Sequence, residues 1–154
     1  MRRFVLWGSA AAAFAVAACS GGAQPPPYKA IADTKILMQA IVDPSAVKVW
    51  QSVRYIVTAD GEEEIKPETD EEWLAIRNAA LTVSESGNLL MMPPRGKDSE
   101  WNRISLAMIG KANELREAAE RHNVDTIFTA GGDLYDICTN CHAKYMKHIV
   151  DLKQ

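Results

Sequence analysis

The sequence Cys138-Thr139-Asn140-Cys141-His142 decides how the rest of the chain is interpreted, because it forms the pattern C-x-x-C-H. This pattern is typical of the attachment site of a c-type haem, in which two thiols bond to the haem vinyl groups. The adjacent imidazole then becomes an axial ligand of the iron. On a helix, residues three and four apart share a face, so Cys138, Cys141 and His142 can address one flat macrocycle.

Three other interpretations of this motif are possible. A structural zinc site needs four ligands, and the sequence offers neither a second cysteine pair nor a nearby cluster of ligands. A thioredoxin-like redox pair should follow a strand in a βαβ pattern, and no such pattern is visible. A chance match is the third alternative, and the N-terminal sequence argues against it. We therefore expect one covalent haem c.

The length, composition and net charge limit the classes of protein to which the chain can belong. With 154 residues, 47% hydrophobic and 24% charged, the chain has the size of one domain and an ordinary globular composition. Its net charge of −3 offers no basic field for nucleic acid. Removal of Arg2 and Arg3 with a leader would make the protein more acidic. Such a charge suits an electron-transfer protein that meets a basic partner, although it selects no particular one.

The N-terminus has the features of an export signal. Arg2 and Arg3 precede an apolar run from Phe4 to Ala18, which is short for a membrane span and fits the hydrophobic region of a signal peptide. The run ends in Val16-Ala17-Ala18-Cys19, which resembles the lipobox of bacterial lipoproteins. We expect a signal peptide over residues 1–18 and a lipid on Cys19. The alternative is ordinary secretory cleavage after Ala15-Val16-Ala17 or nearby.

Cysteine usage agrees with export. Of the three cysteines, two would bind haem and Cys19 would carry lipid, so no disulfide is expected. Bacterial c-type haem is attached outside the cytoplasmic membrane, so both signals predict a periplasmic, lipid-anchored protein. Residues 19–30 are rich in glycine and proline and are expected to form a flexible tether. Residues 31–154 form the expected haem domain.

Hydrophobic periodicity predicts four helices in that domain. The first runs from about Ile31 to Val53, with a bend or break expected at Asp43-Pro44. Its apolar positions are Ile31, Met38, Ile41, Val49, Trp50 and Val53. Residues 54–66 give a weak hairpin signal with a turn at Asp60-Gly61.

The second helix begins at the capping box Thr69-Asp70-Glu71-Glu72 and is stopped by Pro93-Pro94. Its apolar stripe is Trp73, Ile76, Ala80, Val83 and Leu90. Ser99 is expected to cap the third helix, which ends near His122-Asn123. Its buried face is predicted as Trp101, Ile104, Met108, Leu115 and Ala119.

The fourth helix carries the haem motif. One face is lined by Leu134, Ile137, Cys138, Cys141, Tyr145 and Ile149. Val124 to Ala130 is a candidate first part of the same helix, with Gly131-Gly132 as a kink or a place of close approach. Four amphipathic helices joined by short or moderate loops favour an all-α antiparallel bundle.

A single C-x-x-C-H near the C-terminus, followed by Ala143-Lys144-Tyr145, resembles the class II c-type cytochromes, the cytochrome c-prime family. The resemblance extends over about residues 31–150, but only the C-terminal motif is specific. It implies an up-down-up-down four-helix bundle with a C-terminal haem-attachment helix. It also implies His142 as the fifth iron ligand, with a first-helix residue facing the sixth position.

Two features depart from that family. Gas-binding members often have arginine four residues after the haem histidine, where this chain has Met146, and this weakens a nitric-oxide role. The insertion at residues 54–66 is also longer than expected between the first two helices.

Met38 is the candidate sixth ligand. In such a bundle His142 would lie about 12 Å from the end of the last helix, and Met38 about 10 Å into the first. The thioether of methionine is a soft ligand that raises haem potential, although methionine is also common core filler. Met91 and Met92 are competitors that are better suited to the pocket wall.

The remaining pocket assignments are Tyr145 and Trp101 beside the ring, with Arg95 and Lys97 as candidate partners of the haem propionates. Each also has an ordinary structural interpretation. Met146 shares the helix face of His142 and cannot reach the opposite side of the ring. His122 and His148 are expected at the surface.

The leading hypothesis is therefore a membrane-tethered periplasmic monohaem cytochrome that carries electrons and is not an enzyme. Its partners would be redox proteins, and a homodimer is left open. The second hypothesis is a five-coordinate haem protein that binds a small gas such as NO or CO. The third is a haem-free envelope lipoprotein.

Overall fold

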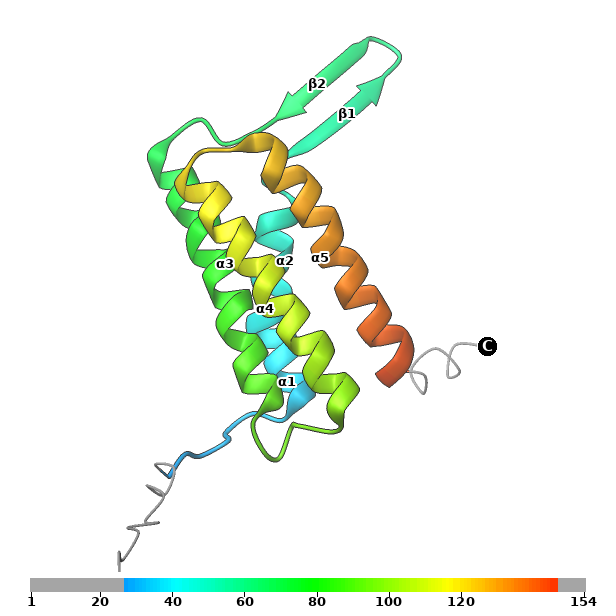
Figure 1. The fold of residues 1–154 in the computed structure, drawn as a ribbon. Coiled ribbons are helices and arrows are strands. Elements are labelled where there is room, and N and C mark those ends of the chain that lie inside the picture. Colours follow the sequence, from blue (N-terminus) through cyan, green and yellow to red (C-terminus); the bar gives the residue numbers. More distant parts are fainter. Residues whose placement is uncertain (1–26, 147–154) are drawn as a thin grey trace, which may run out of the picture.

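The computed structural model describes residues 27–146, which are mostly helical with one small antiparallel sheet (Figure 1). The predicted helical fold is therefore confirmed in its general class. The elements, in chain order, are α1 Thr34–Leu37, η1 Met38–Val42, α2 Asp43–Trp50, β1 Arg54–Thr58, β2 Gly61–Ile65, α3 Asp70–Met91, α4 Ser99–Glu120 and α5 Val124–Tyr145. α3 lies against α4, α4 lies against α5, and α2 contacts both α3 and α5.

The first helical segment continues through Asp43-Pro44, because α1, η1 and α2 follow one another without a gap. Proline has no N–H to donate and crowds the carbonyl four residues earlier, so a break was expected there. In η1 the turn widens to a π-helix, and the N–H of Asp43 donates to the carbonyl of Met38. Pro44 then falls in the first turn of α2, where its missing N–H is not needed. Of the bend or break expected at Asp43-Pro44, the break is therefore wrong, and the helix accommodates the proline through the π turn.

The π turn also changes which side chains of this segment are buried. Leu37 and Val42 are buried, whereas Ile31 is 82% exposed and Ile41 is 36% exposed. A π turn contains an extra residue, so it shifts the phase of the helix faces on either side of it. The predicted apolar position at Ile41, which lies within η1, is therefore wrong. The one at Ile31 is wrong for another reason, because Ile31 precedes α1 and belongs to no helix.

The longer helices begin at side-chain caps. Thr69 and Glu72 form the predicted capping box of α3, in which the Glu72 backbone N–H donates to Thr69 Oγ1 and the Thr69 N–H donates to Glu72. The N-cap of α4 is Asp98, not Ser99, because Asp98 Oδ1 accepts from the Trp101 N–H at 2.7 Å. Asn123 caps α5.

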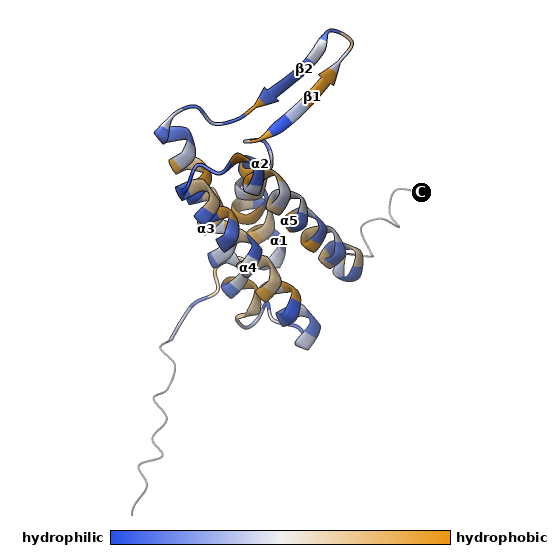
Figure 2. Ribbon diagram, turned by 45° about the horizontal axis from the view of Figure 1, so that its top comes forward, coloured by the Kyte–Doolittle hydropathy of each residue, from blue (hydrophilic) through white to orange (hydrophobic). Residues whose placement is uncertain are grey.

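The core consists of buried hydrophobic residues from all the helical segments. Figure 2 shows that each long helix carries both hydrophobic and hydrophilic residues. The predicted apolar faces of α3 and α4 are buried as expected. α3 and α4 approach closely at Gly87, because a Cβ there would overlap the side chain of Ile109 and lie 3.1 Å from the Ser105 carbonyl oxygen. Beside it, Ser84 Oγ donates to the Ile109 carbonyl at 3.2 Å. These contacts require a small residue at position 87.

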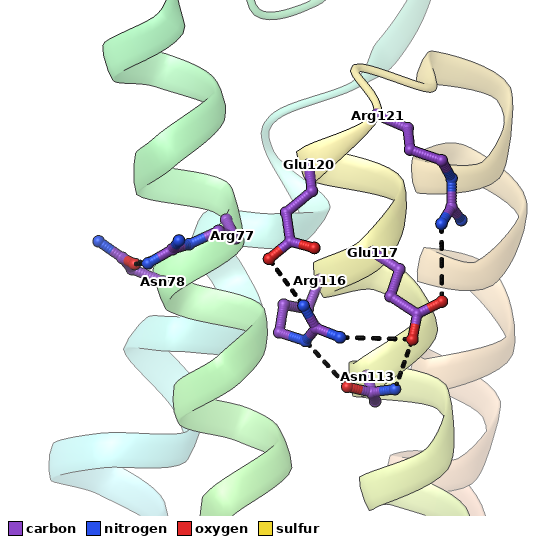
Figure 3. Close-up of polar contacts among 7 residues, drawn as sticks. All are labelled: Arg77, Asn78, Asn113, Arg116, Glu117, Glu120 and Arg121. Carbon is purple, nitrogen blue, oxygen red and sulfur yellow. Dashed lines mark hydrogen bonds and ion pairs between the residues drawn. The ribbon is translucent and has the colours of Figure 1, made fainter.

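The outer surface of α4 is covered by a polar network (Figure 3). Arg116 Nε donates to Asn113 Oδ1 at 2.9 Å, and Arg116 Nη1 pairs with Glu120 at 2.7 Å. Glu117 accepts from Asn113 Nδ2 at 3.0 Å and pairs with Arg121 at 3.6 Å. Such pairs at helical spacing each contribute only a few tenths of a kcal/mol, so the network mainly keeps this face in water.

The weak hairpin signal at residues 54–66 is confirmed. β1 and β2 pair antiparallel with Tyr55 opposite Glu64 and Val57 opposite Glu62. The chain turns at Ala59-Asp60, and the next residue has φ +143°, a conformation that favours Gly61. The hairpin projects beyond one end of the helices, whereas the start of α1, the α3–α4 loop and the end of α5 lie at the other end (Figure 1).

α5 runs uninterrupted through Gly131-Gly132, and of the two glycines Gly131 is the one that another helix approaches, because a Cβ at Gly132 would meet open space. Trp50 Nε1 donates to the Gly131 carbonyl oxygen at 2.9 Å. A Cβ at Gly131 would lie 3.7 Å from Trp50 Cδ1. The indole of α2 therefore rests directly on the backbone of α5.

Candidate functional site

Cys138, Cys141 and His142 lie in the last two turns of α5, near its C-terminus. Both cysteines are partly buried and pack against the core, and both are free thiols. His142 is exposed. The helix therefore presents the two sulfurs toward the other helices and leaves the adjacent imidazole accessible.

Burial determines the protonation state of these thiols. Burial, and to a smaller extent the neighbouring Cys141, raises the pKa of Cys138 to about 11. Burial also raises the pKa of Cys141. Both groups are therefore neutral thiols at neutral pH, with low intrinsic reactivity as nucleophiles.

The apolar face of α5 changes along its length. Ile127, Ala130, Gly131 and Leu134 are buried, so the first part of this face is fully covered. From residue 137 onward the same face is only partly covered, at Ile137, Cys138, Cys141 and Tyr145. The apolar surface that remains uncovered on α5 is therefore the part that carries the two thiols. Two thiols, an adjacent imidazole and uncovered apolar surface fit a covalently attached haem.

Tyr145 and Trp101 meet at this end of the helices, as the prediction that both belong to one pocket requires. Their ring centroids are 5.0 Å apart in an edge-on arrangement. Trp101 Nε1 donates to the Leu90 carbonyl at 2.8 Å, and the Tyr145 hydroxyl donates to Asp98 Oδ1 at 2.8 Å. Burial, followed by this hydrogen bond, raises the pKa of Tyr145 to about 12. The end of α5 is thus tied to the start of α4.

Two lysines flank the ring pair. Lys97 Nζ lies 5.4 Å from the centroid of a Trp101 ring, and Lys144 Nζ lies 5.7 Å from the centroid of Tyr145. Lys144 also lies 3.9 Å from Glu100. The predicted role of Lys97 toward a propionate remains a prediction, and its position beside Trp101 is compatible with it.

Arg95 has a structural explanation of its own. It is buried, with its Nε donating to the Leu89 carbonyl and its Nη1 donating to the Ala32 carbonyl at 2.9 Å. These bonds join the end of α3 to the segment before α1. The guanidinium is therefore engaged by backbone oxygens, and these contacts do not favour its predicted role toward a propionate.

Met38 is partly buried and packs against the core from η1. It follows the start of α1 by four residues, about 6 Å, and His142 precedes the end of α5 by three, about 4.5 Å. Both therefore lie near the same end of the helices. Met91 and Met92 are also partly buried there.

His122 is exposed as expected, and its ring stacks on Trp73 with centroids 4.8 Å apart. Cys19 and His148 lie outside the described residues. Asp98 was not identified from the sequence, although an aspartate three residues before Trp101 is a recognisable capping signal. Its bond to Tyr145 joins residues 47 positions apart, which no local pattern reveals.

Within residues 27–146, no group of three or more histidine, cysteine or acidic side chains comes together in a way that could hold a metal ion. None of the helices in this range has the length and apolar character needed to cross a membrane. Comparisons with known proteins add no relative, because no family model, curated protein or solved structure matches the chain.

Proposed function

We propose that this chain is a monohaem c-type cytochrome of the class II type, which carries electrons in the periplasm of a bacterium. In this proposal the four helical segments form an antiparallel up-down-up-down bundle, and lipid on Cys19 holds the protein to a membrane. The main support is the end of α5, where two thiols on a partly uncovered apolar face stand beside an exposed imidazole.

Each residue has a defined task in this proposal. Cys138 and Cys141 each add a thiol across a vinyl group, so the attachment forms thioethers and releases no leaving group. His142 and Met38 would hold the iron as its two axial ligands from the protein. Trp101 and Tyr145 would line the pocket beside the haem. A haem bound there would provide a one-electron couple between ferrous and ferric iron.

The test is maturation of the full chain in a bacterium that carries a haem-attachment system. We expect the mass of the purified protein to include one covalently bound haem, retained after denaturation. The double substitution Cys138→Ser/Cys141→Ser should remove this mass. Cys19→Ser should keep the haem and lose the lipid. A wild-type protein without haem under these conditions would overturn the proposal and favour the haem-free lipoprotein.

The optical spectrum separates electron transfer from gas binding. With Met38 as sixth ligand, the reduced protein should be low-spin and insensitive to carbon monoxide, and Met38→Ala should make it high-spin and responsive. Met91→Ala serves as the matched control, because it shortens a partly buried methionine at the same end. If the wild type already binds carbon monoxide, the five-coordinate gas-binding function replaces electron transfer.

A further inference from the structure

A groove of about 650 Å³ lies at the hairpin end of the molecule, between α2, β1 and the first half of α5. Its apolar lining includes Val49, Trp50, Val53, Tyr55, Phe128 and Tyr135. The groove reaches along α5 to Asp136, before the residues Cys138, Cys141 and His142, and none of the tasks proposed above uses it.

Two aromatic pairs form this surface. Trp50 and Tyr135 meet edge-on with centroids 5.5 Å apart, and Tyr55 and Phe128 meet edge-on at 5.0 Å. Tyr55, Phe128 and Tyr135 are each about half exposed, and Val57 beside them is 73% exposed. Large apolar side chains gathered in one exposed area are typical of a surface that meets another protein.

The edge of this area is acidic. The Tyr55 hydroxyl donates to Glu64 Oε1 at 3.3 Å. Burial raises the pKa of Tyr55, and the negative charges of Glu64 and Asp125 also raise it. Glu62 is opposite Val57 on the same face of the hairpin, and Figure 2 shows β2 as hydrophilic beside a more hydrophobic β1. Asp136 lines the groove itself.

The charges around the groove are only partly neutralised. Glu64 pairs with Lys66, and Asp133 pairs with Lys111 at 3.0 Å. Within residues 27–146 no ion pair is made by Glu62, Glu63, Asp125 or Asp136. Arg54 contributes one positive charge to the lining. A partner with an apolar centre and a lysine- or arginine-rich rim would match this surface in both respects.

We propose that this groove, together with the adjoining face of the hairpin, is the docking site of a basic partner protein. A second copy of the chain suits the site poorly, because two acidic rims would repel each other. A small molecule also suits it poorly, because the half-exposed rings would leave much of the ligand in water.

The position of the site also suits electron transfer, in which case the partner is a redox protein; this further step rests on the proposed function. Tyr135 lies one turn before Cys138 on α5, and residues three apart on a helix are neighbours. A partner seated on Tyr135 would therefore stand close to the haem attachment site. The paired rings of Trp50 and Tyr135 would then lie between the partner and the haem attachment site.

The experiment is a titration of the isotope-labelled, mature full-length protein with a lysine-rich soluble cytochrome c as the probe, followed by NMR. We expect amide shifts to cluster at Val57, Phe128 and Tyr135 and to disappear at high salt, because screening removes the charge attraction. Shifts spread evenly over the acidic surface would overturn the docking site.

Matched variants test the two components of the surface. Glu62→Lys should weaken binding of the probe by about fivefold or more at low salt. Glu85→Lys, at an exposed position of α3 away from the groove, makes the same charge change and should leave binding of the probe nearly unchanged. Val57→Ser should weaken binding without a change of charge. Equal weakening by both lysine variants would show attraction to net charge alone and would contradict the proposal.

Two further outcomes are decisive. If the same shifts appear on raising the concentration without the probe, the groove binds a second copy, and the proposed partner is wrong. Because binding is measured independently of redox activity, a protein that lacks haem but still binds the probe at the groove would refute the proposed function alone. A haem-loaded protein that does not bind would refute the docking site alone.

Discussion

Asp98 joins two helices through a single carboxylate oxygen. Its Oδ1 accepts from the backbone N–H of Trp101 at 2.7 Å and from the hydroxyl of Tyr145 at 2.8 Å. These bonds, the first being the larger contribution, lower the pKa of Asp98. The start of α4 and the end of α5 therefore depend on the same ionised group.

Acid should weaken this junction. A carboxyl whose pKa is lowered by folding stabilises the protein above its unfolded pKa, about 3.9, and loses this contribution as pH falls through its lower folded pKa. Asp98→Asn keeps an acceptor oxygen at the cap but removes the charge, so unfolding free energy should fall less steeply below about pH 4. Urea unfolding from pH 2 to 7 measures this, with Asp60→Asn in the hairpin turn as control. Parallel acid profiles for Asp98→Asn and wild type would contradict the prediction.

Alkali should weaken the same junction through Tyr145. Because folding raises its pKa to about 12, the hydroxyl contributes stability that is complete below the unfolded value of about 10 and is lost as pH rises through about 12. Tyr145→Phe keeps the ring against Trp101 and removes the proton. We expect its melting temperature to fall less between pH 10 and 12 than that of the wild type. Tyr28→Phe, at an exposed position before α1, should leave the wild-type profile unchanged.

Packing between α3 and α4 depends on the absence of a side chain at Gly87. An added Cβ would overlap Ile109, whose branched side chain has little rotamer freedom in a helix, and approach the Ser105 carbonyl. Gly87→Ala should therefore lower the unfolding free energy by about 1–3 kcal/mol. Chemical denaturation measures the change.

Gly110 provides the matched control in the neighbouring helix. It is exposed on α4 with open space around its Cα, so alanine there should raise stability by up to about 1 kcal/mol through helix propensity alone. Equal effects of the two substitutions would show that the close approach at Gly87 is not a constraint.

The helix starts show where sequence reasoning works and where it fails. Thr69 and Glu72 were predictable as a capping box because the whole signal lies within four residues. Asp98 and Ser99 are adjacent residues that can both cap a helix. Asp98 is the cap, and it also accepts a hydrogen bond from Tyr145, which is far along the chain and invisible to local pattern reading. The accommodation of Pro44 was missed for a different reason: a π turn has no distinct side-chain pattern.

At the scale of the whole molecule, the hairpin is an addition to the helices. A two-stranded hairpin alone is marginally stable, and a prominent side-chain contact with the helices is the Tyr55–Phe128 pair. Replacing residues 54–65 by a short Gly-Ser linker should therefore change the unfolding free energy by only about 1 kcal/mol. Circular dichroism with urea unfolding tests this. Loss of a single cooperative transition would show that the hairpin is part of the core.

The candidate site was predictable in part. The motif identifies Cys138, Cys141 and His142 because its spacing is local, and the structure places the Trp101 and Tyr145 rings together. Arg95 is predicted as a partner of a haem propionate, whereas its buried guanidinium donates to the carbonyls of nearby Leu89 and of distant Ala32, a contact that no local pattern reveals. The docking groove could not be foreseen, because it forms only where α2, β1 and α5 meet.

The lead-in to α1 and the last turn of α5 share one end of the molecule, and the hairpin extends from the opposite end (Figure 1). If the proposed lipid on Cys19 and the proposed haem are both present, the end of the molecule with the haem would be the end joined to the lipid, and the hairpin would be at the end farther from that junction. A diffusing protein would then meet the hairpin first, while membrane-embedded enzymes would approach from beneath. The molecule would then have two separate contact surfaces. One would be turned toward the lipid and would meet membrane proteins, and the other would be turned toward the open compartment and would meet diffusing proteins.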